Sequence, residues 1–427
     1  MKALAILALM LALLLSGVAM AYALGAAAVL SFIITDSTRY LAAIPQRIFT
    51  QVDVFAIMAM PLFVLAGEFM NRAGVTRALI DFSMLIFGRL RGGLGHVNIM
   101  TSVFFAGISG SASADIAALT KTFVPQMERH GYDRYYAGAL TASASVIAPI
   151  IPPSIILIMY GAITATDVAA LFAGGVVPGL LLALSLFITN AIIARKEGHP
   201  GGAGAELPPL WPTLRRAIPA LLLPVIIIGG IVFGITTPIE AGALACVAAL
   251  TIGLVFREIK WPDITESISR TAQLTGSIFM IIAAASLLSY LIVLHKIPDE
   301  LVEIVTSLGL EGIWFVLLIM LLFIIMGMTF DFMLGLLVVA PLLVPIAIAQ
   351  GVHPVALGVL ICVNIAIGLI LPPMGEGLLM VSTITGQKYW ALCMRALPFV
   401  AAELVTLLVI TVFPELILAL PRAMGLL

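Results

Sequence analysis

Charged residues are scarce in this chain, because lysine, arginine, aspartate and glutamate together make up only 10% of its 427 residues. A soluble protein of this length exposes far more charge, so the composition excludes an ordinary soluble globular protein. The formal net charge of −1 gives no sign of nucleic-acid binding. The apolar runs have the length of helices and lack the alternation of strands, which predicts an all-α polytopic membrane protein.

Cysteine is also scarce. The three cysteines, Cys246, Cys362 and Cys393, stand in apolar segments at unrelated spacings, which excludes a disulfide framework and gives no metal-binding pattern. The sequence contains no Asn-x-Ser/Thr sequon and no metal or haem motif. The remaining informative features are the residues that break helices.

Helix-breaking residues repeat along the chain at one spacing. Pro152-Pro153 and Pro372-Pro373 lie 220 residues apart. The same offset pairs further glycines and prolines: Gly107 with Gly327, Pro125 with Pro345, Gly131 with Gly351, Gly138 with Gly358, and Pro178 with Pro398. Glycine and proline fix backbone geometry, so these matches are more informative than apolar ones. The pattern predicts two copies of one membrane unit, and matched helix breakers point to the binding site of a transporter.

The N-terminus has the pattern of a signal peptide, with Lys2, an apolar run and then Ala19-Met20-Ala21. At the offset of 220, however, residues 3–34 correspond to the apolar stretch 217–256. We therefore expect this segment to be retained as part of the first repeat. Residues 3–34 form either one long helix or, as the repeat favours, two helices with a break at Ser16-Gly17.

The apolar segments predict an inverted repeat of about ten crossings and two re-entrant hairpins, at about 97–126 and 312–349. Each repeat then has an odd number of crossings, so the second copy is inverted relative to the first. The expected division is a first repeat at 1–194, a cytoplasmic linker at 195–216 and a second repeat at 217–427.

The distribution of positive charge supports this topology. With the N-terminus outside, sixteen of the 21 lysines and arginines fall on cytoplasmic segments, as the positive-inside rule requires. The base of the first hairpin carries Lys121, Arg129 and Arg134, whereas the matching stretch 345–354 has no lysine or arginine. The first hairpin is therefore expected to open from the cytoplasm and the second from the periplasm.

The tip of the first hairpin, Gly107-Ile-Ser-Gly-Ser-Ala-Ser-Ala-Asp115, faces a proline-rich break at 146–154. Broken helices at membrane depth expose backbone groups that lipid cannot satisfy, and proline leaves carbonyls of the preceding turn free. Carbonyls and serine hydroxyls together suit Na⁺, while half-helix N-termini suit an anion. The alternative is that these small residues only allow close helix packing. The predicted first Na⁺ site comprises Ser109, Ser111, Ser113, Ser143, Ser145 and Pro149.

The second copy places Gly327-Met-Thr-Phe-Asp331 opposite the stretch from Asn364 to Glu376. The predicted second Na⁺ site comprises Gly327, Thr329, Asp331, Asn364 and Gly368. A carboxylate within a membrane span is a functional hypothesis by default. Asp331 is interpreted as a Na⁺ ligand or as a helix cap, and capping is the favoured interpretation of Asp115. Glu376 is interpreted as a ligand of a substrate hydroxyl or amine, as a proton carrier, or as a partner of free amides at a helix start.

Two other classes are weighed against a transporter. Gly107-Ile-Ser-Gly110 matches the Gly-x-Ser-Gly pattern of rhomboid-type intramembrane serine proteases, which need a histidine base at the same depth. The five histidines, however, all stand at segment ends or in loops. A channel would favour an open polar path, whereas the polar groups here cluster in two matched pairs, which favours alternating access.

These motifs resemble a known family. The first hairpin tip, the following Pro125 and Gly131-Tyr-Asp133, and the break Ala148-Pro-Ile-Ile-Pro-Pro-Ser154 are similar to the large membrane subunit of tripartite ATP-independent periplasmic (TRAP) transporters. The likeness covers essentially the whole chain. It implies a multi-pass protein of the bacterial inner membrane, with an elevator mechanism in which a transport domain moves against a scaffold domain.

The resemblance also implies a function, partners and a substrate site. It implies Na⁺-coupled uptake of an organic anion, usually a carboxylate, together with a small four-helix membrane subunit and a periplasmic substrate-binding protein. The substrate is expected between the two breaks. The candidate substrate-binding residues are Ser113, Pro152, Pro153, Ser154, Pro373, Gly375 and Glu376.

The sequence departs from the family at the second break. The family usually has Thr-Pro-Pro-x-Gly there, whereas this chain has Leu371-Pro-Pro-Met-Gly375 followed by Glu376. The missing hydroxyl affects side-chain ligation at the second site but leaves carbonyl ligation possible. The alternative function is a stand-alone Na⁺- or H⁺-coupled anion symporter without a binding protein.

Overall fold

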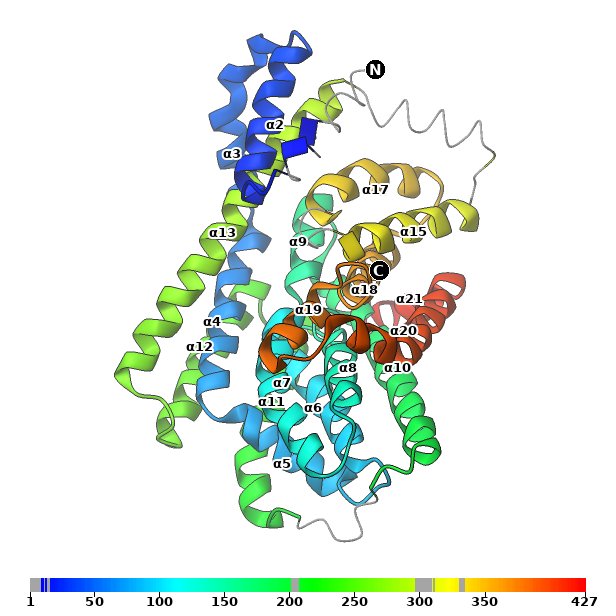
Figure 1. The fold of residues 1–427 in the computed structure, drawn as a ribbon. Coiled ribbons are helices and arrows are strands. Elements are labelled where there is room, and N and C mark those ends of the chain that lie inside the picture. The colour runs from blue at the N-terminus through cyan, green and yellow to red at the C-terminus, as the bar shows by residue number, and fades with distance from the viewer. Residues whose placement is uncertain are drawn as a thin grey trace.

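The computed structural model describes residues 9–10, 12–13, 16–200, 207–295, 309, 312–329 and 335–427. All regular secondary structure in these ranges is helical, which confirms the predicted all-α class (Figure 1). Six helices in these ranges are long and apolar enough to cross a membrane by length and composition: Phe55–Arg72, Val168–Lys196, Leu210–Val232, Pro238–Val255, Trp261–Leu294 and Tyr389–Val412. Shorter apolar helices of 10–17 residues are also present in these ranges.

Helix boundaries repeat at the spacing seen in the sequence. The helix α6 (Gly93–Ser109) and the helix α15 (Ile313–Thr329) begin and end 220 residues apart. The helices α8 (Arg134–Ser145) and α18 (Pro354–Gly368) begin 220 residues apart. The offset of matched glycines and prolines therefore corresponds to a repeat of helices, and in each copy a Pro-Pro pair follows the end of the matched helix, α8 or α18.

Both re-entrant hairpins have the expected two-helix form. The first consists of α6 and α7 (Ala112–Arg129). The second consists of α15, a π-helical segment η4 (Gly335–Val339) and α17 (Ala340–Ala349). Residues 330–334 between its arms, including Asp331, lie outside the described residues. In Figure 1, α15 and α17 lie near the upper end of the molecule, whereas α5 (Val75–Phe87) lies near the lower end.

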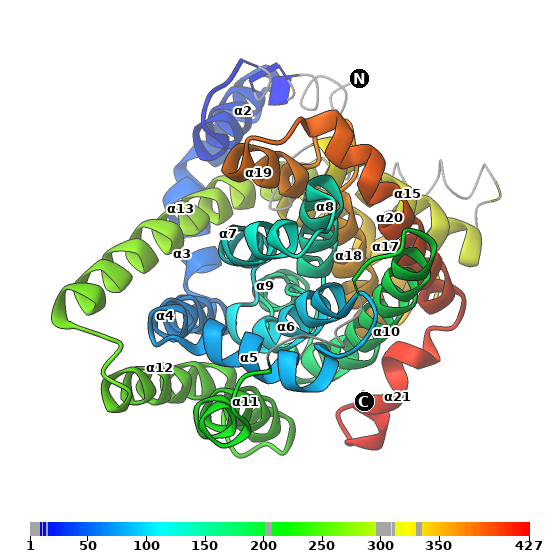
Figure 2. The same cartoon turned by 60° about the horizontal axis from the view of Figure 1, so that its bottom comes forward.

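One set of helices forms an outer arc, visible along one side of the molecule in Figure 2. Within it, α13 packs against α2, α3 and α4, and α12 packs against α4 and α11. The guanidinium of Arg72 at the end of α4 pairs with Asp263 at 2.9 Å and Glu266 at 3.0 Å near the start of α13. The members of the outer arc are α2 (Met20–Ile34), α3 (Ile44–Val52), α4 (Ala59–Arg72), α11 (Leu210–Val232), α12 (Pro238–Val255) and α13 (Trp261–Leu294).

The remaining long helices form an inner bundle, in which α20 packs against α8, α10 and α18. Arg395 on α20 pairs with Glu197, just after α10, at 2.6 Å and with Asp133, the N-cap of α8, at 3.3 Å. The inner bundle consists of the two hairpins with α8, α9 (Ile155–Thr164), α10 (Val168–Lys196), α18, α19 (Glu376–Thr385), α20 (Tyr389–Val412) and α21 (Glu415–Ala423). The helix α5 packs against both α6 of the inner bundle and α11 of the outer arc.

The segments between repeats and near the N-terminus refine the expected boundaries. Helix α10 continues to Lys196 and α11 begins at Leu210, so both ends of the linker predicted at 195–216 are helical. A turn at Ser16-Gly17 precedes α2. At the corresponding place in the second repeat, the hydroxyl of Thr237 caps α12 by accepting from the amide of Glu240 at 3.3 Å. Two short 3₁₀ segments, η1 (Thr38–Ala43) and η2 (Phe55–Met58), connect the first helices.

Candidate functional site

The tip of the first hairpin is a sharp reversal built on glycine and serine. Helix α6 ends at Ser109, and Gly110 adopts a left-handed conformation with φ of +58°. The hydroxyl of Ser111 then caps α7 by accepting from the amide of Ala114 at 3.5 Å. Glycine suits this position because other residues rarely adopt positive φ. The tip thus brings two helix ends together inside the apolar part of the molecule.

This tip rests directly on the proline-rich break of the following helix. A Cβ atom on Gly110 would lie 2.2 Å from the carbonyl oxygen of Pro153, so the two backbones are in contact. The break runs between the end of α8 and Ser154, whose hydroxyl accepts from the amide of Leu157 at 3.1 Å and donates to the carbonyl of Pro149. The Pro152-Pro153 and Pro372-Pro373 bonds are both cis.

The second repeat forms the corresponding contact between Gly327 and Gly368. A Cβ atom on Gly368 would lie 2.6 Å from the Cα of Gly327, so any side chain at Gly368 would push the hairpin away. On the same helix, the amide of Asn364 donates to the carbonyl of Met320 at 2.9 Å. The structure therefore brings together Gly327, Asn364 and Gly368 of the predicted second site. The hydroxyl of Thr329 donates within its own helix to the carbonyl of Ile325 at 2.6 Å.

Several oxygen atoms on the hairpin and on the helices before the two breaks are buried without a hydrogen-bond partner. They include Ser143 Oγ and Asp115 Oδ2 in the first repeat and Asn364 Oδ1 in the second. Leaving such an acceptor unsatisfied in a dry interior costs about 1–3 kcal/mol, and an unplaced ion is one explanation for it. Hydroxyl, carboxylate and amide oxygens are hard ligands, as a small alkali cation requires. The residues present therefore fit Na⁺.

Other predicted ligands of the first site are already engaged. The hydroxyl of Ser145 donates to the carbonyl of Thr141 at 2.9 Å, which leaves its acceptor lone pairs free. The carbonyl of Pro149 accepts from Ser154 and from the thiol of Cys362 at 2.9 Å. The thiol belongs to α18 of the second repeat, so this carbonyl lies where the two broken helices meet.

Asp115 has a different role from the capping expected of it. The cap of α7 is Ser111, while the carboxylate of Asp115 accepts a hydrogen bond from the hydroxyl of Ser109. Asp115 is completely buried. It therefore places a carboxylate directly behind the tip, where capping of a helix was the favoured interpretation.

The predicted substrate residues lie around three helix starts, those of α7, α9 and α19. Helix α19 packs against α7, and a Cβ atom on Gly377 would lie 2.9 Å from the Cδ1 of Ile116. The second break and the first hairpin are therefore side by side. Ser113 is half-buried, Pro152, Pro153, Ser154 and Gly375 are buried, and Pro373 and Glu376 are exposed.

Tyr389 was not predicted from the sequence but supports the second break. Its hydroxyl donates to the carbonyl of Pro373 at 3.0 Å. Glu376 lies in the first turn of α19, directly after Gly375, the N-cap, which has a φ of +40°. This hydrogen bond could not be predicted from the sequence, because Tyr389 stands sixteen residues after Pro373 and reaches it only through the position of α20 in the fold.

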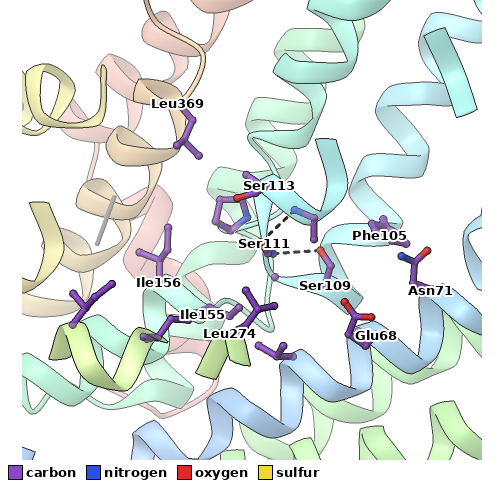
Figure 3. Close-up of a pocket in the computed structure, with 18 residues that line it drawn as sticks. Glu68, Asn71, Phe105, Ser109, Ser111, Ser113, Ile155, Ile156, Leu274 and Leu369 are labelled. Carbon is purple, nitrogen blue, oxygen red and sulfur yellow. Dashed lines mark hydrogen bonds between the residues drawn. The ribbon is translucent and has the colours of Figure 1, made fainter. Parts of the chain in front are cut away.

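A cavity of about 270 Å³ opens beside the first hairpin tip (Figure 3). It is lined by residues of the tip and of α4 and α13 of the outer arc, and also by Ser113, Pro149 and Leu369. Sequence reasoning missed two polar residues of α4 that line it, Glu68 and Asn71. The signal for Glu68 was present, since a carboxylate within a membrane span is unusual.

Known proteins resemble this chain over nearly its whole length. Residues 7–416 match the model of the family described as tripartite ATP-independent periplasmic transporter, DctM component. The C4-dicarboxylate TRAP transporter large permease protein DctM of Pseudomonas aeruginosa is 36% identical over 391 residues, which cover 91% of each chain. The sialic acid TRAP transporter large permease protein SiaM of Vibrio cholerae is 34% identical, with 96% of each chain covered.

A solved structure is similar in fold. The YdaH transporter of Alcanivorax borkumensis aligns with a TM-score of 0.65 over 88% of each chain, at 12% sequence identity. The family match excludes the protease interpretation of Gly107-Ile-Ser-Gly110, because the family is one of transporters rather than enzymes. The chain belongs to the DctM family, the large membrane permeases of TRAP transporters.

Proposed function

We propose that this permease carries a small organic anion into the cell together with Na⁺, across the bacterial inner membrane. The observation that supports Na⁺ coupling is the pair of matched contacts between a hairpin tip and a broken helix. Buried oxygen atoms without partners stand on the helices that lead into the two breaks, Ser143 Oγ on α8 and Asn364 Oδ1 on α18. Two equivalent oxygen-rich sites in two repeats are the arrangement in which secondary transporters place their coupling ions.

The anion is proposed to bind between the two sites. The N-terminal ends of α7, α9 and α19 follow the tip and the two breaks, and helix N-termini attract negative charge through free amides. The candidate substrate residues Ser113, Ser154 and Gly375 stand at or just before these helix starts. Named relatives transport C4-dicarboxylates and sialic acid, and both ligands are carboxylates.

Coupling follows from the dry surroundings of the two sites. An unpaired oxygen dipole or an uncompensated anion resists movement through an apolar barrier. We infer that the inner bundle moves against the outer arc, as in an elevator, when ions and anion are both bound. The partners proposed are a small four-helix membrane subunit and a periplasmic substrate-binding protein that delivers the anion.

Uptake into proteoliposomes tests this function. The permease is reconstituted with its small subunit, and candidate organic anions are offered with and without an inward Na⁺ gradient and the cognate binding protein. We expect uptake only when both Na⁺ and the binding protein are present. Uptake without the binding protein would indicate a stand-alone symporter. An uptake rate that is the same with and without the Na⁺ gradient would refute the proposed Na⁺ coupling.

Ser143→Ala is expected to raise the Na⁺ concentration for half-maximal uptake by about fivefold, because it removes a buried hydroxyl oxygen that has no protein partner. Ser145→Ala is expected to raise it as well, while binding of the partner proteins is preserved. The matched control is Ser185→Ala on α10, whose hydroxyl donates within its own helix to the carbonyl of Leu182 at 2.8 Å. An unchanged Na⁺ midpoint in both site variants would count against the first site.

A further inference from the structure

Glu68 is a carboxylate within a membrane-spanning helix of the outer arc. It stands one turn before Arg72, which pairs with Asp263 and Glu266. The side chain of Glu68 is half-buried, and within the described residues no hydrogen bond or ion pair engages its carboxylate. An ionisable group at such a position is rare unless it faces a water-filled cavity or a pathway.

Glu68 faces the tip of the first hairpin. In Figure 3 its carboxylate is directed toward Ser109. The neighbouring Gly67 confirms that the two elements are close, since a Cβ atom there would lie 3.5 Å from the Cα of Ser109. Among the residues lining the cavity of about 270 Å³ at the tip, Glu68 is the only charged one. Glu68 thus supplies the one charge on this lining, and the buried carboxylate of Asp115 lies behind the tip against Ser109, so the neighbouring charges favour a cation there over an anion.

A second cavity, of about 850 Å³, continues from the first and shares Glu68, Asn71 and Ala114 with it. Its other charged lining residues are Arg77, Asp81, Lys121 and Arg270. Lys121 belongs to the base of the first hairpin, and Arg270 lies in the half of α13 that begins beside Arg72. These are segments expected on the cytoplasmic side. Glu68 thus stands at the junction between the hairpin tip and a wide opening toward the cytoplasm.

We propose that Glu68 is a cation-positioning residue that holds Na⁺ at the first hairpin tip when that tip faces the cytoplasm. The proposal rests on the proposed Na⁺-coupled function and assigns Glu68 a role on one side of the membrane only. Glu68 belongs to the outer arc, whereas the serines of the tip belong to the inner bundle. Movement of the inner bundle toward the periplasm carries the tip away from Glu68, so the charge acts on Na⁺ in the cytoplasm-facing state alone.

As a consequence, Glu68 raises the affinity for Na⁺ on the cytoplasmic side of the membrane and not on the periplasmic side. A carboxylate near a bound cation in partly hydrated surroundings strengthens binding, and removing it weakens binding without changing the ligands supplied by the tip. Glu68→Gln keeps the shape of the side chain and removes its charge. We expect it to weaken cytoplasmic Na⁺ binding by about five- to tenfold and to change periplasmic Na⁺ binding by less than about twofold.

The test uses proteoliposomes that contain the permease with its small subunit. Binding protein is added outside only, so that uptake reports molecules whose periplasmic face is outside. Internal NaCl is varied at fixed external Na⁺, and the internal concentration that halves uptake is measured. External Na⁺ is then varied at zero internal Na⁺. Glu68→Gln should raise the internal Na⁺ concentration that halves uptake, and it should leave the external Na⁺ concentration for half-maximal uptake nearly unchanged. Glu68→Asp should restore the wild-type value for internal Na⁺.

Asn71 supplies the matched variants, because it lines the same two cavities without a charge. Asn71→Ala should leave both midpoints unchanged. Asn71→Asp adds a carboxylate at the junction and should lower the internal midpoint, which provides an independent test if Glu68→Gln fails to assemble. Equal shifts on both sides, or no shift with either charge change, would overturn the proposal. Wild-type uptake without any Na⁺ dependence would instead refute the proposed function itself.

Discussion

Gly110→Ala is expected to abolish uptake while leaving the permease assembled in the membrane. The added Cβ would lie 2.2 Å from the carbonyl oxygen of Pro153, so the tip of the first hairpin must lift off the break it rests on. A left-handed backbone in a residue other than glycine adds about 1–2 kcal/mol of strain. Because the tip carries Ser109 and Ser111, the oxygens of the proposed first Na⁺ site would be displaced together. Initial uptake rates at saturating Na⁺, normalised to protein in the liposomes, measure the effect.

Gly131→Ala is the matched control for this variant. Gly131 also has a positive φ, of +83°, but a Cβ atom there would meet nothing within 4 Å. Its strain is therefore similar, whereas the steric clash is absent. We expect Gly131→Ala to retain most of the uptake rate. Equal loss in the two variants would mean that backbone strain, and not contact between tip and break, limits transport.

Asn364→Ala is expected to raise the Na⁺ concentration for half-maximal uptake at least about tenfold, which corresponds to about 1.4 kcal/mol. The side chain is completely buried, its Nδ2 donates to the carbonyl of Met320 at 2.9 Å, and its Oδ1 has no partner. Alanine removes the free oxygen and the hydrogen bond that ties α18 to the middle of α15 at Met320. The measurement is the Na⁺ dependence of initial uptake at saturating anion.

Asn190→Ala distinguishes a Na⁺ ligand from a structural asparagine. Asn190 is also completely buried, but its Oδ1 accepts from the hydroxyl of Tyr136 and its Nδ2 donates to the carbonyl of Gly92 at 3.4 Å. Losing it should reduce the amount of folded protein and leave the Na⁺ midpoint unchanged. If Asn364→Ala and Asn190→Ala behave alike, Asn364 has only a structural role.

The positions of the hairpins could be predicted from the sequence because glycine and proline act locally. Pro152-Pro153 and Pro372-Pro373 interrupt helices wherever they occur, and their shared offset identified the two copies. The same reasoning placed Gly327 near Gly368 and the serine tip near the first break, since each contact joins elements of one repeat.

Contacts between distant segments could not be predicted in this way. The approach of Glu68 to the hairpin tip depends on how the outer arc packs against the inner bundle, and no local pattern encodes that packing. The hydrogen bond from Cys362 to the carbonyl of Pro149 likewise joins the two repeats, and nothing in the apolar segment around Cys362 indicates it. Asp115 was interpreted as a cap because acidic residues favour first turns, whereas Ser111 already occupies the capping position.

The most direct test of the account measures the fluxes of Na⁺ and of the transported anion in the same proteoliposomes. The account predicts that Na⁺ enters with the anion in the wild-type protein. The Ser143→Ala and Asn364→Ala variants are assayed at Na⁺ concentrations where uptake is still measurable. Each is predicted either to move fewer Na⁺ ions per anion than the wild type, or to need more Na⁺ to reach the wild-type number of Na⁺ ions per anion. Anion uptake without Na⁺ entry, or an unchanged ratio and Na⁺ midpoint in both variants, would contradict the claim that the oxygens at the two contacts bind the coupling ions.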